Sequence, residues 1–203
     1  IGSNHHLAPN SGEDFQMFEK DLPGKSTKSF ATSENDIGNL PLEVCETING
    51  SWGFNLKDRK HKSKKELIQY LIKSAGYGSN LLLNVGPMPN GRIQKEHINS
   101  LKEIGVWIKN NGETIYKTKK GPIDPSDEIA STQKGNKIFI HILDSNKETF
   151  FIENFNLKIK KISYYKSTEK VNYIKNKSGL VLKVPNDKKT PIDTILELEI
   201  YNF

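Results

Sequence analysis

Carboxylates gather in a short stretch near the start of the chain, "SGEDFQMFEKDLPG", where they flank two phenylalanines and a methionine. Such a stretch is either a solvated loop or a loop that holds a catalytic acid. A carboxylic acid that donates a proton near neutral pH needs a desolvated site or a neighbouring anion that raises its pKa. A carboxyl in a loop beside aromatic residues meets that requirement better than one in a lysine-rich helix, and Glu13, Asp14 and Glu19 are all candidates on the residues alone.

Two further glutamates stand on an apolar run of strand length, "PLEVCETI" (residues 41–48). An unpaired charge is costly to bury on such a strand. Glu43 is therefore either a site residue or a structural one, and Glu46 has the same ambiguity of facing and ranks lower. A single cysteine, Cys45, allows neither an internal disulfide nor a cysteine metal cluster. Because it lies on this apolar run, we expect a buried structural thiol instead of a nucleophile.

The elements that must position these residues follow from the periodicity of the first 120 residues. Residues 1–39 are predicted to be rich in loops. Ser63 and Glu66 form a capping box that begins a helix, and a second helix is expected near residues 94–110, with Ile98, Leu101, Ile104, Trp107 and Ile108 as its apolar stripe. Between them the continuous apolar run of residues 80–87 is typical of a buried parallel strand. This alternation predicts a parallel α/β unit.

From about Gly121 the pattern changes to short strand candidates separated by turns. Six runs, from "KIFIHIL" to "TILELEI", recur at spacings of roughly ten residues, which favours an antiparallel sandwich. We therefore expect two domains, residues 1–120 and residues 121–203, with a boundary near residues 117–125.

The overall composition narrows the classes of partner. The formal net charge is +6, but the lysines are spread along the chain and accompany no nucleic-acid-binding motif, so we expect no nucleic-acid partner. No stretch approaches the roughly 18 apolar residues that a membrane span requires, so none is expected.

Three motifs in a fixed order carry a family resemblance. "LPLEVCETINGSWGFN", "SNLLLNVGPMPNGRI" and "IGVWIKNNGETIY" resemble the α-L-fucosidases of glycoside hydrolase family 29, over residues 1 to about 120. The resemblance implies the C-terminal part of a (β/α)8-like catalytic barrel followed by an antiparallel β-sandwich. It also implies an enzyme that removes terminal α-L-fucose from a fucosylated oligosaccharide or glycoconjugate with retention, through a covalent intermediate and without a metal or other cofactor.

The same resemblance suggests roles for individual residues. Glu19 matches the family's acid/base, the alternative being an exposed loop glutamate. Glu43 matches the glutamate of a Trp-Glu pair, except that Leu42 stands in place of the tryptophan; it would position the sugar, serve as the acid itself, or be structural. Trp52 matches the aromatic residue that packs against the methyl group of fucose, the alternative being a core tryptophan.

His5 and His6 stand where other members of the family carry an arginine that contacts the sugar. That departure is associated with the branch that prefers α-1,3/1,4-linked fucose. Adjacent residues of an extended chain point to different faces, so at most one of the two histidines need face the pocket. Asn80 and Asn84 are expected to cap or brace loops rather than to take part in catalysis.

The nucleophile that the family uses, an aspartate on an earlier barrel strand, has no counterpart in this sequence. We therefore expect the remainder of the barrel to lie on a preceding segment or on a companion chain, and this segment alone to be inactive. The lysine-, asparagine- and isoleucine-rich composition suggests a bacterial protein that is secreted or periplasmic. The rival hypothesis is a non-catalytic carbohydrate-binding or structural protein derived from the same family.

Overall fold

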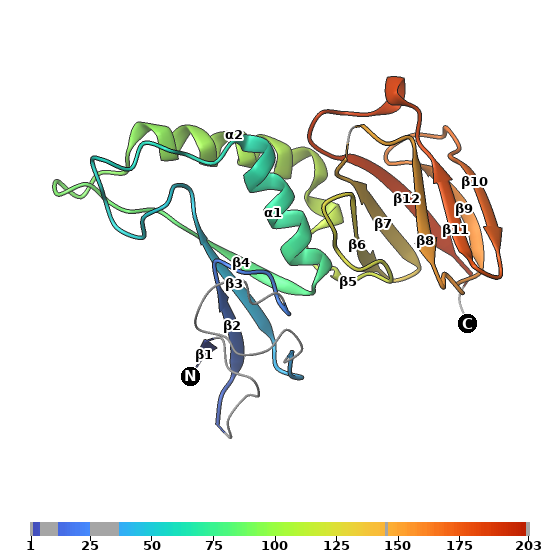
Figure 1. Cartoon of the computed structure of the whole chain (residues 1–203), viewed down its shortest axis with the longest axis horizontal. Coiled ribbons are helices and arrows are strands. Elements are labelled where there is room, and N and C mark those ends of the chain that lie inside the picture. The colour runs from blue at the N-terminus through green and yellow to red at the C-terminus, as the bar shows by residue number, and fades with distance from the viewer. Residues whose placement is uncertain (1, 5–11, 25–36, 145, 202–203) are drawn as a thin grey trace. The chain divides into compact units, whose positions relative to one another are not determined.

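The computed structural model describes residues 2–4, 12–24, 37–144 and 146–201. The chain divides into two compact units, Ile1–Gly112 and Glu113–Phe203 (Figure 1). The first unit is mixed α/β, and the second consists almost entirely of antiparallel strands.

The first unit contains a parallel sheet whose strands are neighbours in chain order. The four strands are β1 (Gly2–Asn4), β2 (Phe15–Glu19), β3 (Leu42–Thr47) and β4 (Ser79–Asn84). Because every strand runs in the same direction, the carboxyl ends of all four strands meet at one edge of the sheet. Residues that follow a strand in sequence are therefore brought together there.

Strand β2 corrects the prediction that the acidic stretch is a loop. The run "FQMFE" pairs in parallel with β3. Gln16 and Phe18 are buried, whereas Phe15, Met17 and Glu19 are half-buried. Alternation with a period of two residues is the mark of a strand. The acidic residues that surround this short run obscured the alternation, so Glu19 ends a strand instead of lying in a loop.

Two helices follow β3 and β4. Helix α1 (Lys64–Gly76) begins with the predicted capping box: the Ser63 hydroxyl accepts from the Glu66 N–H, and the Glu66 carboxylate accepts from the Ser63 N–H. Helix α2 (Lys95–Asn111) was also predicted, but its buried face is different. His97, Ile104 and Trp107 are buried, whereas Ile98 and Leu101 are each 37% exposed.

The second unit consists of two antiparallel sheets that share one apolar core. The strands are β5 (Lys119–Lys120), β6 (Ile129–Lys134), β7 (Lys137–Ile142), β12 (Thr194–Ile200) and β9 (Ile159–Tyr164) in one sheet, and β10 (Asn172–Asn176), β11 (Gly179–Lys183) and β8 (Thr149–Glu153) in the other. Short 3-10 helices lie at Gly112–Thr114 and Asn186–Lys188.

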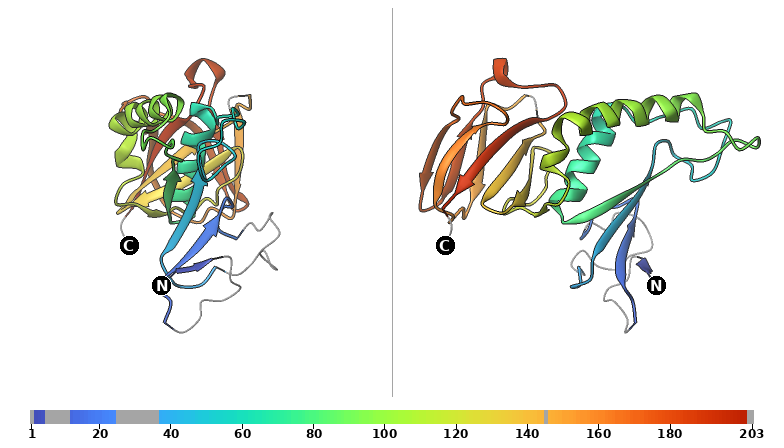
Figure 2. Two further views of the ribbon diagram at one scale, coloured as in Figure 1. Left: turned by 90° about the vertical axis from the view of Figure 1, so that its left-hand side faces the viewer. Right: turned by 180° about the vertical axis from the view of Figure 1, so that it is seen from behind.

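Figure 2 shows the strands of this unit from two further sides. Side chains from both sheets, among them Ile140 of β7, Phe150 of β8 and Leu182 of β11, belong to that core. All six predicted strand runs form strands. The sequence pattern missed β6, because its central residues Ser131 and Thr132 are polar although fully buried.

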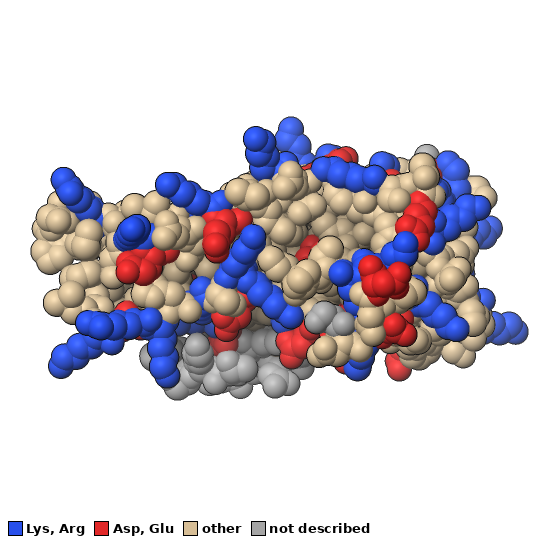
Figure 3. Space-filling view, turned by 90° about the horizontal axis from the view of Figure 1, so that it is seen from above, with Lys and Arg blue, Asp and Glu red and all other residues tan. Residues whose placement is uncertain are grey.

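Charged residues are mixed on the surface. On the face seen in Figure 3, lysines and arginines are interrupted by aspartates and glutamates. Several pairs make direct contact, such as Lys160 Nζ with the Glu199 carboxylate at 2.8 Å. Within the described parts of the chain, no helix combines the length and the apolar character needed to cross a membrane.

Candidate functional site

The two faces of the parallel sheet have different surroundings, and Glu46 identifies the face that is covered by α1. Its side chain is 7% exposed, and its carboxylate lies 3.3 Å from Lys62 Nζ and accepts from the Thr47 N–H at 2.7 Å. On α1, burial raises the pKa of the Tyr70 hydroxyl, and the nearby Glu46 and Asp21 carboxylates raise it further. Glu46 therefore faces the helix and is neutralised by Lys62.

Glu43 and Cys45 point to the opposite face, because successive side chains of a strand alternate. In the register of the sheet Glu19 is opposite Cys45, and Met17 is opposite Glu43. The pKa of the Cys45 thiol is raised by burial, then by the Glu19 carboxylate and then by the Glu43 carboxylate. Register and electrostatics thus agree that Glu19, Cys45 and Glu43 share one side of the sheet.

We call this side the open face; by register it also carries Asn80 and Leu82 of β4. Both are exposed, and for Leu82 the exposed fraction is 47%. An apolar strand residue with that exposure indicates a surface suited to burial under further protein.

Trp52 lies in the segment of residues 48–62 that joins β3 to α1, which we call the Trp52 loop. Asn84, at the end of β4, donates from Nδ2 to the Trp52 carbonyl at 2.7 Å, which confirms the expected loop-bracing role of Asn84. Lys20, directly after β2, donates from Nζ to the Gly50 carbonyl at 2.6 Å. Trp52 is 37% exposed in this chain.

The structure brings some of the predicted site residues together and separates others. Glu19, Glu43 and Trp52 belong to two neighbouring strands and the loop that follows them. Glu13 and Asp14 precede β2 and so lie at the strand end remote from Glu19. His5 and His6 fall outside the described residues.

Sequence reasoning missed one residue of this edge, Lys20. Nothing in the local pattern distinguishes it from the many other lysines, and only its place directly after Glu19 could have drawn attention to it.

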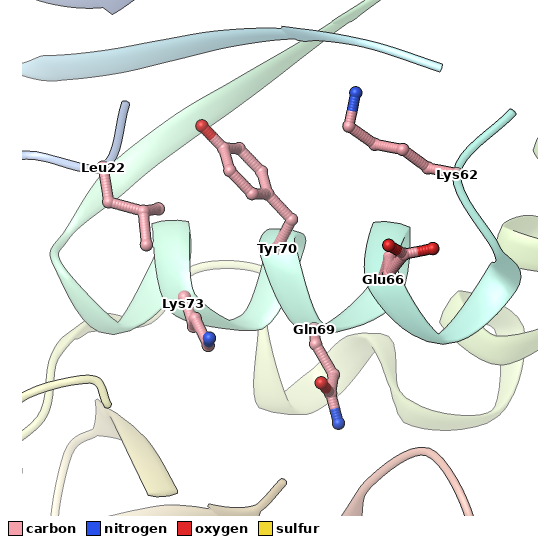
Figure 4. Close-up of a pocket in the computed structure, with 6 residues that line it drawn as sticks. All are labelled: Leu22, Lys62, Glu66, Gln69, Tyr70 and Lys73. Atoms are coloured by element: carbon pink, nitrogen blue, oxygen red, sulfur yellow. The ribbon is translucent and has the colours of Figure 1, made fainter. Parts of the chain in front are cut away.

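A hollow of about 270 Å³ lies beside α1 and is separate from the open face. It is lined by Leu22, Lys62, Glu66, Gln69, Tyr70 and Lys73. In Figure 4, Lys62 and Tyr70 project toward the strands, whereas Gln69 and Lys73 point away from them. The described residues contain no group of three or more histidines, cysteines, aspartates or glutamates that could hold a metal ion.

Glu19 and Glu43 lie on the open face, Glu19 at the carboxyl end of β2 and Glu43 as the second residue of β3. The partly exposed indole of Trp52 lies in the loop that follows β3. A half-buried carboxyl such as Glu19 can transfer a proton. A second carboxylate can accept hydrogen bonds from ligand hydroxyls, and an exposed indole offers an apolar surface to a ligand. Together, two carboxylates and an indole could bind a polar ligand that has one apolar patch.

Comparison with known proteins yields a consistent set of relatives. A family model described as alpha-L-fucosidase matches residues 1–113, which is more than half of the chain. The chain is 37% identical over 79 residues to the plasma alpha-L-fucosidase of Homo sapiens, an alignment that covers 37% of this chain and 17% of that protein.

Solved structures extend the likeness over nearly the whole chain. Alpha-L-fucosidase isoenzyme 1 from Paenibacillus thiaminolyticus superposes with a TM-score of 0.77 at 26% identity, covering 98% of this chain and 50% of that one. The alpha-fucosidase of Thermotoga maritima gives a TM-score of 0.74 at 26% identity, covering 93% of this chain and 43% of that one. The chain therefore spans half or less of the length of these relatives.

Proposed function

Because the chain belongs to the alpha-L-fucosidase family, we propose that it is the C-terminal part of a retaining exo-α-L-fucosidase that removes terminal α-L-fucose from glycans. The observation that carries the proposal is the shared position of Glu19 and Glu43 on the open face of the sheet, with Lys20, the residue after Glu19, in contact with the Trp52 loop. The substrate would be a fucosylated oligosaccharide or glycoconjugate.

Strand order supports a barrel as the setting of this site. In a (β/α)8 barrel, consecutive parallel strands are neighbours around the ring, and active sites lie at the carboxyl ends of the strands. In doubly wound folds the strand order reverses at a switch point. The order β1-β2-β3-β4 contains no reversal, and Glu19 ends its strand at the edge where a barrel would place the chemistry. The rest of the barrel would come from protein that this chain does not contain.

The proposed reaction has two steps. A carboxylate nucleophile from the rest of the barrel attacks the anomeric carbon, while the Glu19 carboxylic acid gives its proton to the leaving glycosidic oxygen. In the second step the Glu19 carboxylate removes a proton from water, which attacks the same carbon and releases fucose with retained configuration. Glu43 would accept hydrogen bonds from sugar hydroxyls, and Trp52 would cover the methyl group of the sugar.

The test is a Glu19→Gln substitution in the complete enzyme, assayed with two kinds of substrate. With a fucosylated oligosaccharide, kcat/KM should fall by roughly 10²- to 10⁴-fold, the usual contribution of general acid catalysis. With an aryl fucoside whose phenol is a good leaving group, kcat/KM should fall far less, because the first step then needs no proton. Equal losses on both substrates would contradict the role of Glu19, and sugar binding without turnover by the unaltered protein would favour the non-catalytic rival.

A finer part of the proposal concerns linkage. His5 or His6 in place of the family's arginine would favour α-1,3/1,4-linked over α-1,2-linked fucose. The ratio of kcat/KM for two trisaccharides that differ only in this linkage measures the preference. An enzyme that cleaves the α-1,2 linkage faster would contradict it.

A further inference from the structure

Lys20 occupies an unusual place in the backbone, directly after Glu19 at the end of β2. Its φ angle is +58°, in the left-handed region that residues with a side chain seldom adopt. The Lys20 N–H donates to the Cys45 carbonyl at 2.8 Å, which fixes this turn against β3. The lysine side chain thus leaves the strand at a point where the ordinary alternation of a strand has ended.

Among the described residues, the Lys20 ammonium contacts the Trp52 loop at two points. It donates to the Gly50 carbonyl at 2.6 Å, and it lies 4.9 Å from the centroid of the Trp52 ring. An ammonium at that distance over an indole is held by a cation–π interaction. One side chain therefore ties both the backbone and the aromatic ring of this loop to the residue that follows Glu19.

The end of β4 holds the same loop from another strand. Asn84 bonds the Trp52 carbonyl, and two residues later Gly86 packs against the loop backbone. A Cβ atom on Gly86 would lie 2.5 Å from the carbonyl carbon of Gly53 and 2.7 Å from the Phe54 nitrogen, so only glycine fits. Trp52 is consequently fixed by the ends of two strands, with Lys20 as the contact that reaches its ring.

We propose that Lys20 is a positioning residue that sets how the indole of Trp52 meets the sugar relative to Glu19. This inference rests on the proposed function, because it explains how the proposed fucosidase site would select its sugar. An ammonium on one face of the indole leaves only the other face and the edges for an apolar ligand group. The remaining face would cover the apolar methyl group of the sugar, a contact that a hydroxymethyl group would disrupt.

The first experiment reads the position of Trp52 without any assay of activity. The full polypeptide that carries this sequence is labelled with 5-fluorotryptophan, and the 19F resonance of Trp52 is assigned as the line that is missing from a Trp52→Phe variant. Lys20→Met should shift or broaden that line, whereas Lys20→Arg, which keeps the cation, should largely restore it. Lys57→Met, which removes an exposed lysine of the same loop, is the matched control and should leave the line unchanged. An unshifted line in Lys20→Met would overturn the proposal.

The second experiment measures specificity in the same variants. For Lys20→Met, kcat/KM with an aryl α-L-fucoside should fall about three- to tenfold, and the preference over the matching aryl α-L-galactoside, which carries a hydroxymethyl group, should fall by a similar factor. An unchanged preference with an altered 19F line would also overturn the role in sugar choice. If the unaltered protein hydrolyses neither substrate, the proposed function fails, while the 19F result still decides whether Lys20 positions Trp52.

Discussion

At the scale of single residues, Glu43 and Glu46 show how one strand separates two identical side chains. They are three positions apart, so alternation must place them on opposite faces, and the sequence leaves open only which residue faces the helix. Two residues on the side of α1 show that Glu46 faces the helix. Lys62 forms an ion pair with Glu46, and the Glu46 carboxylate raises the pKa of Tyr70. Glu43 is left on the open face with Glu19.

The two glutamates should respond differently to the same substitution. Glu46→Gln removes the charge that Lys62 neutralises, so the free energy of unfolding should fall by about 1–3 kcal/mol, with little change in activity of the complete enzyme. Glu43→Gln should leave stability within about 0.5 kcal/mol, as expected for a half-buried residue, and should raise KM for a fucoside. Urea unfolding and steady-state kinetics on both variants test this pair. A stability loss confined to Glu43→Gln would reverse the assignment of faces.

At the scale of elements, the sequence predicts best where side-chain chemistry is local. The Ser63–Glu66 capping box lies within one helical turn, so it could be predicted from the sequence. Strand β2 could not, because its alternation extends over only five residues between acidic neighbours. The buried face of α2 was predicted from apolar residues alone, yet Leu101 is 37% exposed and His97 is fully buried. The ring of His97 contacts that of His61 in the Trp52 loop, a tertiary contact that helical periodicity does not encode.

The cap of α1 gives the first prediction at this scale. Ser63→Ala removes the hydroxyl that accepts from the Glu66 N–H, so the free energy of unfolding should fall by about 1 kcal/mol, a typical cost for losing an N-cap. Ser63→Asp keeps an acceptor and should retain most of the stability. Urea denaturation followed by circular dichroism measures both variants. Equal stability of Ser63→Ala and the unaltered chain would show that the cap contributes nothing.

His97 gives a prediction about pH. It is fully buried, and the ring centroid of His61 lies 5.3 Å away. The pKa of His97 is lowered from its ordinary value of 6.5, mainly by burial and then by His61, against smaller opposing effects of Glu96 and Asp58. Below pH 6.5 the unfolded state therefore binds more protons than the folded state, and stability should decrease as the pH falls further.

The measurement is the urea midpoint at pH 7.5 and at pH 5.0. The midpoint of the unaltered chain should be lower at pH 5.0, and His97→Leu should lose part of this difference because no proton can bind at that position. His61→Gln is the control for the neighbouring ring and should remove a smaller part. A pH dependence that is identical in His97→Leu would show that other groups cause it.

At the scale of the whole molecule, the change from alternating helices and strands to strands alone could be predicted from the sequence. The spacing of the apolar residues changes at the same point of the chain. The sequence could not show which residues meet on the open face, because that depends on strand register. Glu19 lies opposite Cys45, 26 positions later in the chain, through pairing that no local pattern encodes. Lys20 became visible as part of the site only once the Trp52 loop had been placed.

The proposal of a longer enzyme leads to a prediction for this chain by itself. Parallel sheets are normally covered on both faces, yet the open face leaves Leu82 47% exposed, and in the described part of the chain β4 pairs only with β3. The purified 203-residue polypeptide should therefore hydrolyse no aryl α-L-fucoside, and co-expression with the segment that carries the remaining barrel strands should restore turnover. A Glu19→Gln version of the polypeptide is the control for contaminating glycosidases. Turnover by the 203-residue polypeptide alone, abolished by Glu19→Gln, would show that the site is complete without those strands.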